Sequence, residues 1–406
     1  MINETIRNSK KIKIFPFVIT NEILPQRVYP ALLSPEIIPH FEITAFGGRP
    51  SKDKIIDRLD KEIDKREGYK KEWRSKHTKI EIASLHDFSN RIENGTPYFE
   101  IDDEKYTVPR EVYESNDCVF IGTNNLTHDA YTADAVNNGK HFIVEKPYVV
   151  TKEGLKNVED LEKLIEEKGL IGKVTAHFAH KPASLALFEN IQGFVGEYGK
   201  INKISGFYEE FDDPLKGRTI DTFDKNKSGG GICLDTLGHF EIILVALGAH
   251  IDLNGETFFE WDSYNGFNSE TYAKVRHKIR DGNSFKDGAE AEIIVSKFAD
   301  RYENPLNKEH KELILNFEGG HNANVLFSEN KIEIKKNENL EKTILGNHPL
   351  NEYISVLEDF YKCILEGRES FTSTKVGIEA MNVILHLYDH YRNDKHKISK
   401  YRQNGA

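Results

Sequence analysis

Two residues that could transfer a proton lie four positions apart near the middle of the sequence. Asp235 and His239 belong to the segment GGGICLDTLGH, residues 229–239. Its glycines permit a tight turn into a helix, and a spacing of four residues places the carboxylate and the imidazole on one helical face. A carboxylate can orient a neighbouring imidazole and support its protonated form. The pair predicts a general base that works near neutral pH, although plain surface pairs share this spacing.

A lysine with a restricted backbone is the second candidate. Lys146 lies between Glu145 and Pro147, directly after the apolar segment HFIV. Proline fixes its own φ and restricts the residue before it, and the bond between them can be cis. This restriction would aim the ammonium group, although a lysine after a strand can also be an ordinary surface residue. Thr123, in the segment GTNNLTH, follows another apolar run. Ligands of open parallel sheets bind beyond the carboxyl ends of such strands.

The first part of the chain alternates strand and helix patterns around these residues. Strand-like segments cover residues 11–20, 41–46, 79–83, 117–122 and 141–144, and helix-like segments cover residues 26–33, 128–138 and the stretch after Thr151. Gly139 is expected to end one helix and Thr151 to cap the next. The alternation predicts a Rossmann-type, doubly wound parallel sheet. We assign it to residues 1–148, with a charged insertion over about 51–108 that includes a hairpin at 98–107.

The pattern changes in the second part of the chain. Strand-like runs cover residues 172–178, 200–209, 291–298, 312–317 and 324–334. Few helices separate the last three runs, which favours a large, mostly antiparallel sheet. The C-terminus returns to helix, with an apolar stripe over residues 354–364 and a further helix over 376–388. We predict an α+β domain over residues 149–406, used for substrate binding and oligomerisation, whose C-terminal helices pack back on the first domain.

Composition narrows the class of protein. The 406 residues suggest two or three domains. A net charge of −11 argues against nucleic acid as a partner, because phosphate binding needs clustered lysine and arginine. The sequence has no apolar run of about 18 residues and no apolar signal core, so we expect a cytoplasmic protein with no membrane segment. Cys118, Cys233 and Cys363 are widely spaced, so neither a disulfide framework nor a metal site is expected.

Taken in order, the motifs resemble those of one enzyme family. GTNNLTH and NNGKHFIVEKP are similar to the TPN-x-x-H and GKH-hydrophobic-x-EKP signature of the glucose-fructose oxidoreductase / inositol dehydrogenase (Gfo/Idh/MocA) family. GGGICLDTLGH resembles its GGG-x-x-x-D-x-x-x-H signature. VTAHFAHKPASLALFENI and GEYGKINKISGFYEE resemble the start of its second domain, and LNEYISVLEDFYKCILEGRESFTST its C-terminal helices. The resemblance spans nearly the whole chain except the insertion near residues 51–108.

The resemblance implies hydride transfer between a nicotinamide cofactor and a hydroxyl or carbonyl carbon of a sugar, sugar phosphate or cyclitol. Lys146 would contact the reacting hydroxyl and help to position the nicotinamide. His239 would accept the hydroxyl proton, with Asp235 as its partner. The residues that would line the cofactor side, with Glu145 nearby, are Thr123, Asn125 and His128.

Three weaker candidates for substrate contacts follow from the same resemblance. They are His180, Lys181 and Tyr208. Lys181 could pair with a phosphate group, because ammonium groups often do, but it could equally be a solvated lysine.

The first turn departs from the family pattern. The family carries GxGxxG after its first strand, because glycines let the backbone approach the pyrophosphate. Here the segment is VITNEILPQRVYPALL, with Thr20, Glu22 and Pro25 at the glycine positions. Glu22 would place a negative charge near a pyrophosphate, which is unfavourable. The cofactor contacts expected from this turn are those of Thr20, Asn21, Glu22 and Ile23.

The same turn also resembles the start of glucose-6-phosphate dehydrogenases, GxxGDLAxRKLLPAL. In that alignment Val18 and Asn21 replace the glycines, and asparagine tolerates left-handed backbone better than most residues. HFAHK, residues 177–181, faintly resembles the DHYLGK segment of those enzymes. This second resemblance favours a phosphorylated sugar.

Cofactor preference rests on the segment FGGRP after the second strand. An acid at such a site binds the ribose 2′-hydroxyl of NAD, and an arginine accommodates the 2′-phosphate of NADP. The strand end has no acid, but Arg49 follows it. We expect NADP in preference to NAD, unless Arg49 is an ordinary loop residue.

Three functions remain open on the sequence alone. The leading one is an NADP-linked or NAD-linked dehydrogenase or reductase that acts on a CH–OH group. A sugar-binding or regulatory protein that has lost dinucleotide binding and redox turnover would explain the missing glycines. An enzyme with a tightly held dinucleotide could also oxidise its substrate only transiently. The large sheet and the resemblance predict a homodimer or homotetramer.

Overall fold

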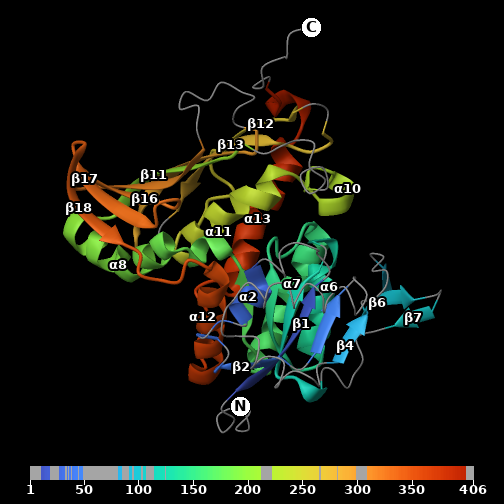
Figure 1. Cartoon of the computed structure of the whole chain (residues 1–406). Helices are drawn as coiled ribbons and strands as arrows, with labels where there is room; N and C mark the ends of the chain where they lie inside the picture. The colour runs from blue at the N-terminus through green and yellow to red at the C-terminus, as the bar shows by residue number, and fades with distance from the viewer. Residues whose placement is uncertain are drawn as a thin grey trace. The chain divides into compact units, whose positions relative to one another are not determined.

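The computed structural model describes most of the chain. The described residues are 11–18, 27–48 apart from 33, 35, 38 and 44, the strands at 81–84, 91–93, 96–101 and 104–106, and 114–398 apart from 124, 212–221, 265–266, 281 and 299–308. The chain divides into two compact units (Figure 1). The first unit comprises residues 1–175 and 351–375, and the second comprises residues 176–350 and 376–406.

The first unit is built on a parallel sheet. Its described strands lie in the order β10-β9-β8-β1-β3-β4, with β2 also paired to β1. Every pairing is parallel. The bounds are β1 Ile12–Val18, β2 Phe41–Ile43, β3 Ala45–Gly48, β4 Glu81–Ser84, β8 Cys118–Gly122, β9 His141–Glu145 and β10 Gly172–Thr175. The sheet confirms the Rossmann-type prediction.

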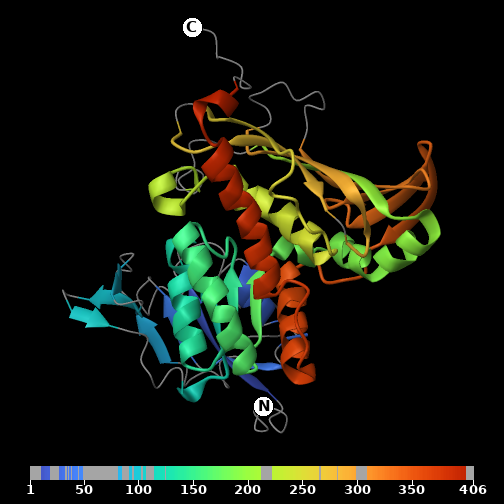
Figure 2. The ribbon, with the colours of Figure 1, turned by 180° about the vertical axis from the view of Figure 1, so that it is seen from behind.

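Helices cover both faces of this sheet. The helices are α2 (Tyr29–Leu32), α6 (His128–Asn137), α7 (Lys152–Glu167) and α12 (Glu352–Glu366). Alternate strand residues such as Ile14, Phe120 and Ile143 share one apolar core with α2 and α12. Figures 1 and 2 show α6 and α7 side by side on the opposite face. The predicted caps are confirmed, because Thr151 Oγ1 accepts the Gly154 N–H at 3.0 Å and Gly139 has φ +67°.

The insertion is described only in part. Strands β6 (Thr96–Ile101) and β7 (Glu104–Tyr106) pair antiparallel, as the predicted hairpin requires, and β5 (Arg91–Glu93) pairs with β6. The charged stretch 51–77 lies outside the described residues.

The second unit is built on a mixed sheet. The described strands lie in the order β12-β13-β14-β11-β15-β16-β17-β18. Only β11 and β14 pair parallel, and the other neighbours pair antiparallel. The bounds are β11 Ile201–Glu209, β12 Phe258–Asp262, β13 Tyr272–Ile279, β14 Phe285–Ser296, β15 His310–Phe317, β16 His321–Leu326, β17 Lys331–Lys336 and β18 Asn339–Leu345. The mostly antiparallel prediction is confirmed.

One face of this sheet is buried under helices. The directly paired residues Ile204, Leu315, Ala323 and Ile334 are all buried. Helix α8 (Pro182–Tyr198) packs against β16, β17 and β18, and α11 (Gly238–Ala246) packs against β11 (Figure 1). Helix α13 (Thr374–Tyr391) contacts the start of α11. Alternate strand residues on the other face are partly exposed.

Two sequence expectations need correction. The run 172–178 was assigned to the second sheet, with the domain boundary at 148/149, but β10 pairs parallel with β9 and the units divide at 175/176. A strand that follows a crossover helix such as α7 returns beside the preceding strand. The run 324–334 is also two strands, β16 and β17, joined by a turn that ends at Asn330 with φ +52°. Asparagine accepts this left-handed conformation.

A buried ion pair ties α12 to β10. The Nζ of Lys173 lies 2.6 Å from Asp359 Oδ2 and donates to the hydroxyls of Ser370 at 2.7 Å and Thr372 at 2.9 Å. Burial lowers the pKa of Lys173, and the Asp359 carboxylate opposes that shift. A buried charge requires partners of this kind, so the residues after α12 must stay close to β10.

We expect Lys173→Met to destabilise the first unit by about 3–5 kcal/mol, because it leaves the Asp359 carboxylate without its ammonium partner. Chemical denaturation followed by circular dichroism measures the change. Lys163→Met, which removes a largely exposed lysine of α7, should change stability by no more than about 0.5 kcal/mol. Equal stability of the two variants would contradict the assigned role of Lys173.

Candidate functional site

The carboxyl ends of β8 and β9 bring two predicted residues to one edge of the sheet. Ile121 pairs with Val144 in parallel register, and Thr123 and Lys146 each lie two residues further along their strands. The peptide bond between Lys146 and Pro147 is cis, one of the two geometries expected from the sequence. Asn125 lies close by in η2 (Asn125–Thr127), and Thr127 donates from its hydroxyl to that of Thr123 at 3.0 Å.

His128 joins the loops that follow these two strands. Its ring is entirely buried, with Nδ1 2.7 Å from the Pro147 carbonyl oxygen and Nε2 3.1 Å from that of Thr123. Burial lowers the pKa of His128, and the two carbonyl groups oppose the shift. A neutral imidazole donates from one nitrogen at a time. The buried ring therefore lies between the two loops and donates to one of them at a time. A direct contact with a cofactor stays a prediction.

Glu145 is also a buried residue that supports the backbone next to Lys146. Tyr353 of α12 donates from its hydroxyl to Glu145 Oε1 at 2.7 Å. Burial raises the pKa of Glu145, while hydrogen bonds from Thr175 and Tyr353 lower it. These contacts fix the end of β9 immediately before Lys146.

The segment that carries Asp235 and His239 is not a regular α-helix throughout. A π-helical turn, η4, covers Cys233–Leu237, and α11 begins at Gly238. The sequence expectation of one shared α-helical face is corrected accordingly, because the wider turn changes the angle between the two side chains. Such turns are often found at functional sites.

Asp235 and His239 have different surroundings. The Asp235 side chain is 25% exposed, and its Oδ2 lies 3.4 Å from the Nζ of Lys297. His239 is buried, and its ring centroid lies 4.5 Å from that of His177 and 5.2 Å from that of Phe178. His177 was not among the predicted site residues, although it belongs to the segment HFAHK, from which His180 and Lys181 were selected.

The weaker substrate candidates lie in the same unit. His180 is buried at the end of η3 (His177–His180), and Lys181 directly precedes α8 with its Nζ 5.0 Å from the Phe178 ring centroid. Tyr208 is buried near the end of β11, and its ring centroid lies 5.1 Å from that of Phe178. Phe178 therefore contacts both Tyr208 and His239 in the apolar part of this region.

A buried carboxylate holds the glycine-rich turn in place. Glu270 Oε1 accepts the N–H groups of Gly231 at 3.2 Å and Cys233 at 3.3 Å, as well as the hydroxyl of Tyr388. Its Oε2 lies 2.9 Å from Nη2 of Arg392. A Cβ on Gly231 would lie 2.2 Å from the Glu270 carbonyl oxygen. No local motif marks Glu270, Tyr388 and Arg392, so sequence reasoning missed them.

Several predicted cofactor residues cannot be placed. Thr20, Asn21, Glu22, Ile23 and Arg49 lie outside the described residues. The resemblance of this region to glucose-6-phosphate dehydrogenases therefore stays a prediction. Within the described ranges, no helix is long and apolar enough to span a membrane, and no group of three or more potential metal ligands is found.

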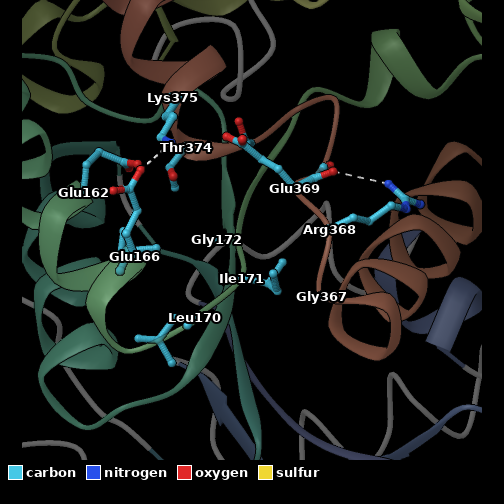
Figure 3. A pocket seen from close by; sticks show the side chains of 14 residues that line it. Glu162, Glu166, Leu170, Ile171, Gly172, Gly367, Arg368, Glu369, Thr374 and Lys375 are labelled. Carbon is cyan, nitrogen blue, oxygen red and sulfur yellow. Dashed lines mark hydrogen bonds and ion pairs between the residues drawn. The ribbon is translucent and has the colours of Figure 1, made fainter. Parts of the chain in front are cut away.

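A small cavity lies beside the amino end of strand β10 in the first unit. Figure 3 shows Glu162 and Glu166 of α7 facing Thr374 and Lys375 across it. Its volume of about 210 Å³ is below the roughly 300–1,000 Å³ of common ligand sites. Lys375 and Glu166 close part of it with a 2.6 Å ion pair. We do not assign the candidate site to this cavity, because Thr123 and Lys146 lie at the other ends of the strands.

Comparison with known proteins finds one family model that matches part of the chain. Residues 70–175 match the model of the Gfo/Idh/MocA oxidoreductase family, described as an NAD-binding Rossmann fold. Over this segment the chain is similar to the Gfo/Idh/MocA family. The match includes β8, β9 and β10 with the loop that carries Lys146. In a search of the curated proteins, none matches the sequence.

Solved structures share the fold of this chain along most of its length. A levoglucosan dehydrogenase in complex with NADH and levoglucosan has a TM-score of 0.69 at 13% identity, over 97% of this chain and 100% of the other. UDP-N-acetylglucosamine 3-dehydrogenase from Acidithiobacillus ferrooxidans gives 0.62 at 13%, over 92% and 96%. A 3-ketoreductase from Actinomadura kijaniata, in complex with NADP and TDP-benzene, gives 0.63 at 14%, over 97% and 100%. At such identities the likeness establishes the fold alone.

The buried turn of the second unit predicts a sensitive glycine. We expect Gly231→Ala to destabilise the protein by about 1–3 kcal/mol, because the new methyl group collides with backbone. Gly193→Ala is the matched control, since nothing lies within 4 Å of a Cβ added there in α8. It should leave the melting temperature unchanged or raise it, because alanine is the better helix former. Similar melting temperatures for both variants would contradict the packing assigned to Gly231.

A second prediction concerns Glu241, which lies in α11 two residues after His239. It is entirely buried, with Oε2 3.6 Å from His277 Nε2. Burial raises the pKa of Glu241 to about 8 and lowers that of His277 to about 4. The folded state holds the Glu241 proton at pH values where the unfolded chain, with a pKa of about 4.3, has lost it. This contribution to stability is therefore lost as pH rises towards about 8.

The substitution Glu241→Gln should remove this pH dependence of stability. Relative to the wild type, we expect the variant to gain stability between about pH 5 and pH 8, by up to ~1.4 kcal/mol per pH unit. Urea denaturation at several pH values measures the difference. The exposed Glu256→Gln should run parallel to the wild type. Parallel curves for Glu241→Gln as well would show that Glu241 is ionised in the folded protein.

Proposed function

We propose that this protein is an NAD(P)-dependent oxidoreductase that transfers a hydride between a nicotinamide and a hydroxyl or carbonyl carbon of a sugar, sugar phosphate or cyclitol. The observation that carries the proposal is the placement of Lys146 beside Thr123 at the carboxyl ends of two neighbouring parallel strands, in a segment that matches an NAD-binding family. Ligands of such sheets bind at this edge. The sugar-related names of structures with the same fold support the substrate class.

The described residues fit the nicotinamide end of a dinucleotide. Thr123, Asn125 and Lys146 offer polar groups beyond β8 and β9, and His128 fixes the backbone between them. When bound, the nicotinamide accepts or donates a hydride at C4. The turn that would hold the pyrophosphate falls in residues 19–26, outside the described ranges, so the contacts of Thr20–Ile23 remain part of the proposal.

The protein side chains would manage the proton. In the oxidative direction, the substrate C–H bond breaks with its electron pair leaving as hydride, and the O–H proton passes to His239. The ammonium group of Lys146 would stabilise the negative charge that grows on the oxygen. Asp235 would support the imidazolium that forms. A carbonyl product results, and the reverse sequence describes reduction.

NADP is the proposed cofactor, on the basis of Arg49. Structures with this fold include one in complex with NADH and one with NADP, so the fold is compatible with both. Dissociation constants for NADPH and NADH on the wild type and Arg49→Ala decide between them. Loss of affinity for NADPH alone supports NADP, and tighter binding of NADH by the wild type rejects it.

A second function is favoured by one observation. The segment VITNEILP lacks the glycines that normally approach the pyrophosphate. A folded protein that binds sugars but neither nucleotide would be a sugar-binding or regulatory homologue. Nicotinamide absorbance in the purified protein would instead indicate a tightly held dinucleotide and transient oxidation.

We also propose a homodimer or homotetramer formed through the large sheet. Its uncovered face carries partly exposed apolar residues such as Phe207, Ile294 and Ile314, and such patches often mark interfaces. Light scattering coupled to size-exclusion chromatography measures the assembly. A monomer at micromolar concentration would reject this part of the proposal.

Loss of either the Lys146 ammonium group or the His239 imidazole should abolish most turnover. With a panel of sugars, sugar phosphates and cyclitols, we expect Lys146→Met and His239→Ala to lower kcat/KM by about 10²-fold or more. Absorbance of NADPH or NADH follows the reaction. Lys163→Met and the exposed His250→Ala serve as matched controls with wild-type rates. Unchanged turnover in Lys146→Met and His239→Ala would reject the mechanism.

A further inference from the structure

Four side chains of the second unit form a charged cluster next to Asp235. Tyr208 and Glu210 come from the end of β11, Lys297 directly follows β14, and Lys311 belongs to β15. The neighbouring strands β14, β11 and β15 bring these positions together, because Tyr208 pairs with Val295 on one side and Lys311 on the other.

Glu210 is the centre of the cluster. Its Oε2 binds the ammonium group of Lys297, and its Oε1 binds that of Lys311. The Tyr208 hydroxyl donates to Oε1 at 3.0 Å. The two ammonium groups lie 5.3 Å and 4.9 Å from the Tyr208 ring centroid, within range of a cation–π attraction. The Lys297 side chain is only 13% exposed, so these contacts hold it in place.

Glu210 and Lys297 carry opposite charges at neutral pH. Burial alone would raise the pKa of Glu210, but the two lysines lower it to about 2. Burial also opposes the charge on Lys297, yet the carboxylates of Asp235 and Glu210 outweigh it and raise the pKa of Lys297. Lys297 is thus a fixed positive charge shared between two carboxylates, one of which is Asp235 at 3.4 Å.

We propose that Lys297, held by Glu210, is a positioning residue that orients the Asp235 carboxylate and moderates its effect on His239. The inference rests on the proposed function, in which Asp235 supports a proton-accepting His239. Lys297 draws the Asp235 carboxylate towards the end of β14 and offsets its negative charge. His239 then stays neutral, and able to accept a proton, at a lower pH than it would beside an isolated carboxylate.

The surrounding charges determine the direction of each effect. Three groups face Lys297. They are Asp235 of η4, and Tyr208 and Glu210 at the end of β11. Lys311 faces Glu210 and, at 3.8 Å, Glu309. His239 faces His177 of η3. Removal of Lys297 leaves excess negative charge near His239, and removal of the Glu210 charge leaves excess positive charge.

The test compares variants with opposite expected shifts. In Lys297→Met, the acid limb of the kcat/KM profile should move up by about one pH unit, and kcat should fall about tenfold with a smaller change in KM. In Glu210→Gln, the acid limb should move to lower pH. Lys297→Arg keeps the charge and should restore most of the profile.

Lys311→Met is the matched control, because it removes a second lysine from the same Glu210 carboxylate. It should shift the profile less than Lys297→Met does, because Lys311 pairs with Glu210 and Glu309, whereas Lys297 contacts the Asp235 carboxylate itself. Circular dichroism and melting temperature verify that each variant is folded. If Lys297→Met does not fold, Lys297→Arg and Glu210→Gln still carry the comparison. Equal shifts for Lys297→Met and Lys311→Met, or shifts of the same sign for Lys297→Met and Glu210→Gln, would overturn the proposal.

A second readout separates this inference from the proposed function. NMR titration of ¹³C-labelled histidine, with His239→Ala and His177→Ala used for assignment, measures the His239 pKa without substrate. That pKa should rise in Lys297→Met and fall in Glu210→Gln. A wild type without turnover but with these shifts rejects the enzyme and keeps the role of Lys297. An active wild type whose His239 titration is unchanged in both variants rejects the role of Lys297 alone.

Discussion

The shape of the segment that carries Asp235 and His239 depends on one buried carboxylate. Glu270 satisfies two backbone N–H groups of the glycine-rich turn and pairs with Arg392 beyond α13. An unpaired carboxylate in this position would be strongly unfavourable, so the turn, the strand entry at residue 270 and the chain after α13 must be in place together. Gly231 is required because the Glu270 backbone approaches too closely for any side chain. The π turn of η4 begins at Cys233, one of the two residues whose N–H groups Glu270 binds.

In the first unit, buried side chains likewise hold the backbone around a candidate residue, through both neutral and ionic contacts. His128 joins the two loops at the carboxyl edge, Tyr353 holds Glu145 immediately before Lys146, and Lys173 attaches the residues after α12. Lys146 itself projects from a backbone that buried partners fix on several sides. Its placement therefore depends on contacts that span more than 200 residues of sequence. Pre-organisation of this kind lets a charged group act without a large reorganisation cost.

Chains that are only 13–14% identical to this one share its fold. The parallel sheet and the mixed sheet require only an apolar pattern and suitable turns, and many sequences satisfy both. The contacts around Asp235 depend on individual charged side chains. Glu210 and Lys297 place a fixed positive charge against the Asp235 carboxylate, so the electrostatic setting of Asp235 depends on side chains outside the quoted motifs.

The sequence alone predicted most elements of both units and a set of candidate site residues. Apolar periodicity and turn residues act locally, so β8, β9, α6, α7 and their caps at Gly139 and Thr151 could be predicted. The motif spacing selected Lys146, Asp235 and His239. Tertiary structure decided what local pattern does not encode. It placed β10 in the first sheet, split the run 324–334, and replaced a regular helix with a π turn at Cys233–Leu237. It also paired Asp235 with Lys297, which Glu210 holds in place. The glycine-rich turn was paired with Glu270. Those partners are distant in sequence from the residues they contact. Only the folded chain brings these buried charges close enough to pair.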